Sequence, residues 1–157
     1  MSRFLATEEG VRVQLLDSEV AILARLGGLL GGAGVEKDDP AGKRLRPTIY
    51  VNDADASREF DRLAAKERVE VRSADRERFN EGLQAAAVGT TTLSAEETAV
   101  WARVLGESRI VLAARKGLFD TGLPDDRPDD PEVSLLMYLG LLQEELVAAM
   151  LATMEAN

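Results

Sequence analysis

The segment SAEETAVWARVLGESRIVLAAR, residues 94–115, decides the fold class of this chain. Ser94 followed by Glu97 has the form of a capping box, in which each residue satisfies a free backbone N–H of the other at the start of a helix. Apolar residues then recur at helical spacing, among them Trp101, Val104, Leu105, Val111 and Leu112. The pattern predicts an amphipathic helix over residues 95–117.

Other helices are expected on both sides of this one, because apolar residues at the same spacing follow residues that cap helices. Asp17 or Ser18 begins the first, and Asp130-Pro131 begins the last, with an acidic cap before a proline at the first helical position. The predicted ranges are 17–30, 53–66, 73–87 and 131–154.

The N-terminal residues 3–15 alternate apolar and polar side chains around Glu8-Glu9-Gly10, which predicts a two-stranded β-hairpin. Residues 31–47 and 119–131 are rich in glycine, proline and aspartate and are expected to be loops. The sequence therefore predicts one mainly α domain over residues 1–157, a bundle of about five helices with a small N-terminal β-hairpin.

Composition narrows the chemistry available to the chain. The 157 residues include no cysteine and no histidine, which removes disulfides, thiol redox chemistry and the side chain most often used for proton transfer near neutral pH. The acidic run Asp125, Asp126, Asp129 and Asp130 fits no cation-binding loop pattern and is interpreted as a solvated capping loop. We expect a protein that is not an enzyme and that binds no metal or cofactor.

Charge and hydropathy bear on partners and location. A net charge of −9 opposes binding to phosphate backbones, so no direct nucleic-acid binding is expected. The N-terminus lacks the basic and apolar regions of a secretory signal. The most apolar stretch, residues 133–154, has Gln143, Glu144 and Glu145 in its middle, which favours a buried helix over a membrane span. We expect a cytoplasmic protein.

The candidate site residues lie on the two longest apolar helices. Arg109 and Arg115 interrupt one apolar pattern, and Gln143 and Glu144 interrupt the other. Half-buried arginines need acceptors, so these residues form either a polar notch for a partner or an Arg–Glu pair that fixes helix register, and we favour the pair. Trp101 is interpreted as a core anchor, with an interaction hot spot as the alternative.

Three segments taken together carry a resemblance to a known family: Arg44-Leu45-Arg46-Pro47 with Tyr50 and Glu59-Phe60; Trp101 to Leu105 with Arg109 to Leu112 and Arg115; and Tyr138 to Leu146. With the opening hairpin, they resemble the actinobacterial AosR-like family. The resemblance implies a redox-responsive regulator of the oxidative-stress response that works with a stress sigma factor. The better-studied type senses oxidants through an N-terminal cysteine pair, which residues 1–16 lack.

The leading hypothesis is thus a non-enzymatic cytosolic regulator that binds another protein, such as a sigma factor or another part of the transcription machinery, without a disulfide switch. A homodimer formed through the C-terminal helix is the first alternative, because residues 133–154 have more apolar residues than one stripe requires. A carboxylate-based enzyme using Glu144 or Glu145 with Arg109 or Arg115 is the second.

Overall fold

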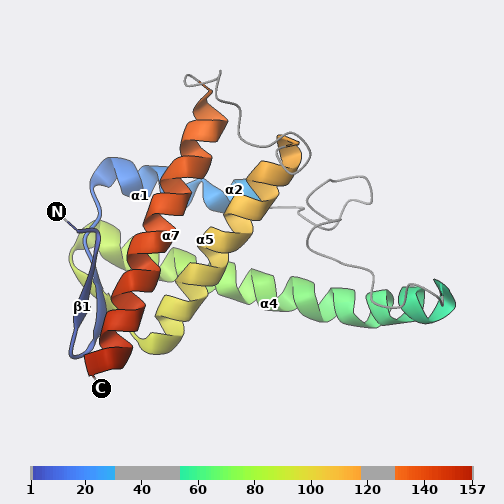
Figure 1. Ribbon diagram of the computed structural model, residues 1–157, viewed down its shortest axis with the longest axis horizontal. Helices are drawn as coiled ribbons and strands as arrows, with labels where there is room; N and C mark the ends of the chain where they lie inside the picture. The colour runs from blue at the N-terminus through green and yellow to red at the C-terminus, as the bar shows by residue number, and fades with distance from the viewer. Residues whose placement is uncertain (1, 31–53, 118–129, 157) are drawn as a thin grey trace.

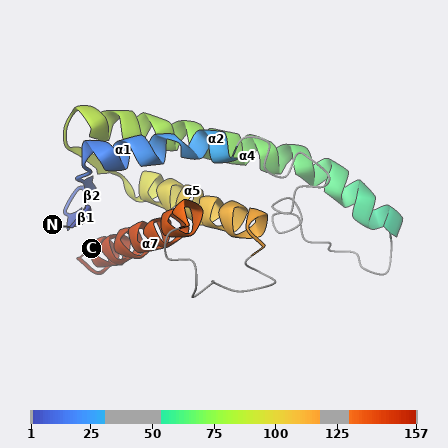
Figure 2. The same cartoon turned by 90° about the horizontal axis from the view of Figure 1, so that it is seen from above.

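The computed structural model describes residues 2–30, 54–117 and 130–156. Figures 1 and 2 show two layers of helices, with α1, α2 and α4 in one layer and α5 and α7 in the other, and a small sheet at the end where both chain termini lie. The elements in chain order are β1 (Phe4–Thr7), β2 (Gly10–Val13), α1 (Asp17–Ala24), α2 (Leu26–Leu30), α4 (Ala54–Val88), β3 (Thr91–Leu93), α5 (Ala95–Arg115) and α7 (Pro131–Ala156). The predicted mainly α fold with an N-terminal antiparallel hairpin is confirmed.

The prediction of separate helices at residues 53–66 and 73–87 is wrong, because α4 runs unbroken from Ala54 to Val88. Ser73, the first residue of the predicted range 73–87, is an exposed residue inside α4. The intervening residues 66–72 contain Lys, Glu and Arg, which favour a helix by intrinsic propensity even though they form no apolar stripe. In Figures 1 and 2, the N-terminal part of α4 reaches beyond α5 and α7.

The predicted helix 17–30 is instead two short helices, α1 and α2, separated at Arg25. The Arg25 N–H bonds the carbonyl of Ile22, three residues back, and so closes the first helix with a tight turn. The last carbonyls of α2 are satisfied from other helices, since Arg115 donates to Leu29 O at 2.6 Å and Arg76 donates to Leu30 O at 3.0 Å. These two arginines therefore fix the end of α2.

The sheet contains one strand more than the predicted hairpin. β1 pairs with β2, and β2 pairs with β3 in the order β1-β2-β3, both antiparallel, with Val11 opposite Leu93. Gly10 has φ of 141°, and a Cβ there would lie 2.1 Å from Leu93 O. Only glycine fits this point of the sheet.

The capping box at the start of α5 is confirmed. Glu97 N donates to Ser94 Oγ at 3.1 Å, and Ser94 N donates to Glu97 Oε2 at 2.8 Å. The core lies between α5, α7, the C-terminal part of α4 and the sheet, and Trp101 sits in its centre with 1% exposure. Its ring contacts Phe79 of α4 at 4.5 Å and Phe4 of β1 at 6.2 Å between centroids. Trp101 therefore joins the two layers to the sheet.

α7 begins where the sequence predicts, with Asp130 Oδ1 accepting from the N–H of Glu132 at 2.9 Å and of Val133 at 3.4 Å. By length and composition alone, α7 is the one helix among the described residues that could cross a membrane. One side of it buries Leu139, Leu142 and Leu146 completely against its neighbours. The predicted loops, residues 31–47 and 119–131, and the resemblance residues 44–50 lie outside the described residues, apart from Asp130 and Pro131.

Candidate functional site

The polar contact predicted between the two apolar helices exists at the crossing of α5 and α7, but it is not an Arg–Glu pair. Arg109 Nη1 donates to Gln143 Oε1 at 2.8 Å, and Gln143 Nε2 donates to Ala102 O at 3.3 Å. Small residues allow this approach: a Cβ on Gly106 would lie 3.0 Å from Gln143 Nε2, and one on Gly140 would lie 3.5 Å from the Arg109 guanidinium. The amide of Gln143 thus bridges the helices.

A groove of about 500 Å³ opens beside this contact, and Arg109, Gln143, Glu144, Val147, Ala148 and Leu151 line it. Arg109 and Glu144 are both exposed. This groove brings together three of the predicted site residues, Arg109, Gln143 and Glu144.

The other predicted residues lie elsewhere. Arg115 bonds the end of α2, and Trp101 is buried in the core, which contradicts the alternative of a surface hot spot at Trp101. Glu145, expected as a partner for the α5 arginines, instead pairs with Arg3 at 2.9 Å. The predicted Arg–Glu pair between α5 and α7 is therefore wrong.

Arg3 belongs to a polar cluster that ties the sheet to α1 and α7. Its Nε donates to Glu19 Oε2 at 2.6 Å, and the Tyr138 hydroxyl donates to the same oxygen at 2.8 Å. Burial, and then the hydrogen bond to Glu19, raise the pKa of Tyr138 above its ordinary value. Because Arg3 donates to both Glu19 and Glu145, and Tyr138 also donates to Glu19, this cluster holds the N-terminus against α1 and α7.

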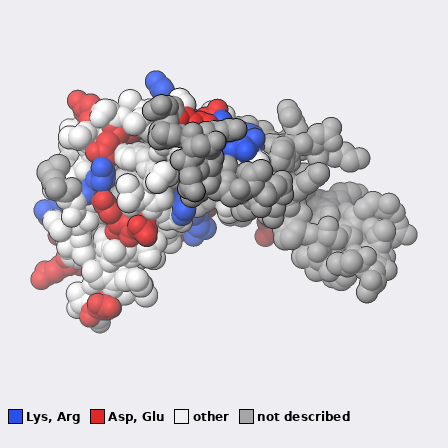
Figure 3. Space-filling model, turned by 45° about the horizontal axis from the view of Figure 1, so that its top comes forward, with Lys and Arg blue, Asp and Glu red and all other residues white. Residues whose placement is uncertain are grey.

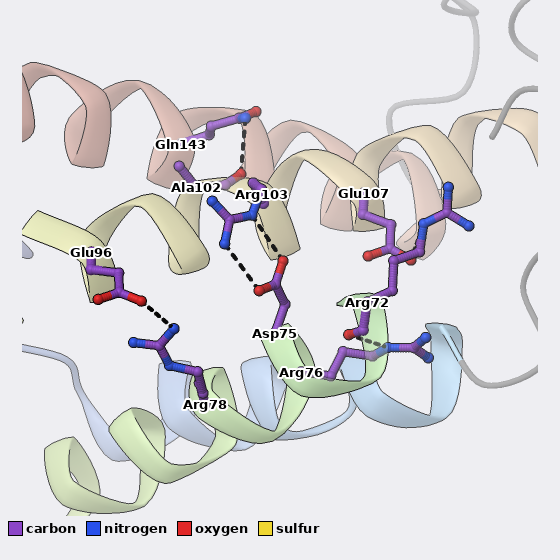
Figure 4. Close-up of polar contacts among 9 residues, drawn as sticks. All are labelled: Arg72, Asp75, Arg76, Arg78, Glu96, Ala102, Arg103, Glu107 and Gln143. Carbon is purple, nitrogen blue, oxygen red and sulfur yellow. Dashed lines mark hydrogen bonds and ion pairs between the residues drawn. The ribbon is translucent and has the colours of Figure 1, made fainter. Parts of the chain in front are cut away.

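A second groove, which the sequence analysis did not predict, runs between α4 and α5. Its volume is about 650 Å³, and its charged lining residues are Glu67, Asp75 and Glu107 with Arg68, Arg72 and Arg103. Figure 4 shows the polar side chains of the two helices facing each other across it. At one point Arg103 donates from Nε and Nη2 to the two oxygens of Asp75 at 2.8 and 3.0 Å, a bidentate pair that links the helices.

Glu107 is the unusual residue of this groove. Its side chain is only 9% exposed, and its Oε1 is buried without a hydrogen-bond partner. The nearest cation is Arg72, whose Nε lies 3.8 Å from that oxygen, beyond hydrogen-bonding distance. Burial raises the pKa of the Glu107 carboxyl, while the charges of Arg76 and Arg72 oppose the rise. In the free protein this oxygen therefore has a cation nearby but no hydrogen-bond donor.

Among the residues that the structure describes, no three or more carboxylates gather closely enough to hold a metal ion. Asp125, Asp126 and Asp129 lie outside the described residues, and the fourth acid of that run, Asp130, bonds Lys116 Nζ at 3.0 Å while it caps α7. The Lys116 hydrogen bond, followed by the bonds from the backbone, keeps the pKa of Asp130 below its ordinary value.

Comparison with known proteins places the chain in a family. A family model described as Domain of unknown function (DUF2017) matches residues 1–150, so the chain belongs to that family. The searches of curated proteins and of solved structures each gave no match.

Proposed function

We propose that this protein is a regulator that acts in the cytoplasm by binding another protein, and that the groove between α4 and α5 receives a basic side chain of that partner. The observation on which this rests is the buried, unbonded Oε1 of Glu107. A buried acceptor without a donor lowers the stability of the free protein. A partner that supplies the donor removes this cost, and the gain contributes to the free energy of binding. A Lys or Arg suits the carboxylate best.

Charge supports a basic partner. The chain has a net charge of −9, and a surface of that sign attracts a positively charged protein and speeds its association. Val71 and Ile110 line the same groove and are partly exposed, so they offer apolar contact to the stem of a long basic side chain.

The resemblance to the AosR-like family suggests the identity of the partner, a stress sigma factor or another component of the transcription machinery. The family regulators of the better-studied type switch through a cysteine pair, and this chain has no cysteine. We therefore propose binding that no disulfide in this chain controls.

The test is to measure binding of the purified stress sigma factor from the same organism to the wild-type protein and to two variants of α5. Glu107→Gln removes the buried charge of the groove. Glu96→Gln removes an exposed charge of the same helix, one whose side chain is 78% exposed and pairs with Arg78. We expect roughly tenfold weaker binding for Glu107→Gln, the loss typical of a charged hydrogen bond, and unchanged binding for Glu96→Gln.

Two results would contradict the proposal in different ways. Equal affinity of the wild-type protein and Glu107→Gln would exclude the groove as the binding site. Failure of both the sigma factor and RNA polymerase to bind the wild-type protein would exclude the transcription machinery as the partner.

A carboxylate-based enzyme is less well supported. Glu145 is engaged by Arg3, and Arg115 is bound to the end of α2, so two of the residues required for it are committed to structural contacts. Glu144 lies beside Arg109 in the groove between α5 and α7, where both are exposed to solvent. An open position of this kind differs from the enclosed pockets in which substrates usually bind.

A further inference from the structure

The outer face of α7 is apolar and exposed. Met137, Leu141, Leu151 and Met154 have exposures of 60, 56, 50 and 66%. On the face seen in Figure 3, uncharged surface extends over much of the described part, with single acidic and basic side chains between. Exposed apolar residues that gather on one helix face mark an interaction site more often than scattered ones do.

The spacing of this face is that of a helix that packs against another helix. The exposed positions Met137, Leu141, Glu144, Ala148 and Leu151 follow one another at intervals of four and three residues. This alternation keeps a seam on one side of a helix and is the spacing of coiled-coil contacts. The inner face, with Leu139, Leu142 and Leu146, already packs in the core.

The seam carries large exposed side chains in both halves and a groove in its C-terminal half. Met137 and Leu141 are exposed before Glu144, Leu151 and Met154 are exposed after it, and the groove of about 500 Å³ lies around Ala148. Two copies of α7 placed antiparallel, with the twofold axis at Glu144, would set Met137 opposite Leu151 and Leu141 opposite Ala148. The exposed apolar side chains of one copy then contact those of the other, and Leu141 of each copy lies over the groove at Ala148 of its partner.

The charges are complementary in the same arrangement. The Arg109 guanidinium lies over Gly140, one turn before Glu144, and one of its donors is bound to Gln143. A guanidinium has five N–H donors, so donors remain for a carboxylate. At the axis, the Glu144 carboxylates of the two copies would each meet an Arg109, which neutralises both pairs of charges.

We propose that the occupant of this face is a second copy of the chain, bound through an antiparallel α7–α7 contact centred on Glu144 and Arg109. This inference does not depend on the proposed function, because it rests on Glu144, Arg109 and the outer face of α7 and not on Glu107, although Gln143 borders both grooves.

Disulfide cross-linking tests the register. Because the chain contains no cysteine, any disulfide must form between the introduced residues. Leu141→Cys and Ala148→Cys variants are prepared separately and then mixed under oxidising conditions. In the proposed register, the cysteine at position 141 of one copy lies opposite the cysteine at position 148 of the other. Two cysteines at position 141 would lie about six residues, roughly 9 Å, apart along the helix axes. That separation is too large for a disulfide. We expect disulfide dimers from the mixture and only background from either variant alone, with Val88→Cys, an exposed position on α4, measuring that background.

Charge exchange tests the centre of the contact. Sedimentation equilibrium gives the dimer dissociation constant of the wild-type protein, of Glu144→Arg, of Arg109→Glu and of the double variant. Each single exchange places like charges together and should weaken the dimer roughly tenfold or more, and the double variant should regain most of the affinity.

Several outcomes would overturn the proposal. A wild-type protein that remains monomeric at the highest soluble concentration excludes it. Cross-links between two copies of the same cysteine variant, with none between the two different variants in the mixture, show a parallel contact. A monomer whose α7 binds neutral phosphatidylcholine vesicles, with binding lost in Leu141→Glu, shows that the occupant is a lipid surface instead.

Discussion

Gly82 of α4 lies directly against the indole of Trp101 of α5, so closely that a Cβ on Gly82 would stand 2.9 Å from Nε1 and 3.1 Å from Cζ2. The indole is itself held between Phe79 and Phe4 in the core. The absence of a side chain at Gly82 thus lets α4 and α5 pack at this distance.

Gly82→Ala should therefore destabilise the protein, even though alanine is the better helix former. The new methyl group must displace a buried ring with few free directions, and overpacking of this kind costs about 1–3 kcal/mol. Urea unfolding followed by the fluorescence of Trp101, the only tryptophan, measures the loss. Gly28→Ala in α2 is the control: no atom lies within 4 Å of its Cβ, and this variant should be unchanged or up to about 1 kcal/mol more stable.

Glu107→Gln should stabilise the protein at neutral pH, in contrast to its expected effect on binding. The pKa of Glu107 is raised in the folded state from 4.5, so protonation favours folding. The favourable contribution of the protonated form is complete below pH 4.5 and is lost as the pH rises through the folded-state pKa. A glutamine stays neutral throughout.

The unfolding free energy of Glu107→Gln should consequently exceed that of the wild-type protein at pH 7 and approach it near pH 4. Glu96→Gln should show no such dependence, because its side chain is exposed. If Glu107→Gln were less stable at pH 7, attraction from Arg72 and Arg76 would outweigh burial.

Tyr138→Phe should cost roughly 0.5–1.5 kcal/mol, the contribution of the hydrogen bond from its hydroxyl to Glu19. Because the folded-state pKa of Tyr138 lies above 10.0, the contribution of the neutral hydroxyl is present below pH 10 and is lost as the pH rises beyond the raised value. Ultraviolet titration should accordingly find Tyr138 ionising only at strongly alkaline pH. A wild-type titration identical to that of a free tyrosine near pH 10 would contradict the buried hydroxyl.

Ser94→Ala should destabilise α5 by about 1 kcal/mol, because it leaves the N–H of Glu97 without its side-chain acceptor. Thermal unfolding at neutral pH measures the change. Ser134→Ala, an exposed position within α7, is the matched control and should shift the unfolding free energy by less than about 0.5 kcal/mol.

Signals local in sequence predicted the parts of the fold that depend on local contacts. The capping box of Ser94 and Glu97 and the cap at Asp130 gave the starts of α5 and α7 correctly. β3 was missed because three residues, Thr91–Leu93, are too few to show alternation, and the strand depends on pairing with β2 far away in the chain. The end of α2 likewise depends on contacts from Arg76 and Arg115 that no local pattern contains.

The same limit explains the candidate site. The contact of Arg109 with the Gln143 region could be anticipated, because polar residues stood out on two apolar helices. The groove residues Asp75, Arg103 and Glu107 could not be anticipated. Charged residues of these types usually lie at solvent-exposed positions of a helix, so the sequence does not mark them as part of a site. The continuous course of α4 is what brings Asp75 opposite Arg103, and the sequence analysis had divided that helix in two.

Gln143 lines both grooves, since its side chain reaches the groove beside Arg109 and the one that contains Glu107. The Gln143 amide has one set of donors and acceptors. An orientation of the amide that suits a molecule bound in one groove therefore limits the hydrogen bonds available in the other groove. If a basic side chain in the α4–α5 groove draws this amide away from Arg109, self-association must weaken, and thermodynamic linkage requires self-association to weaken partner binding by the same factor. One glutamine would then make the two assemblies compete without sharing a surface.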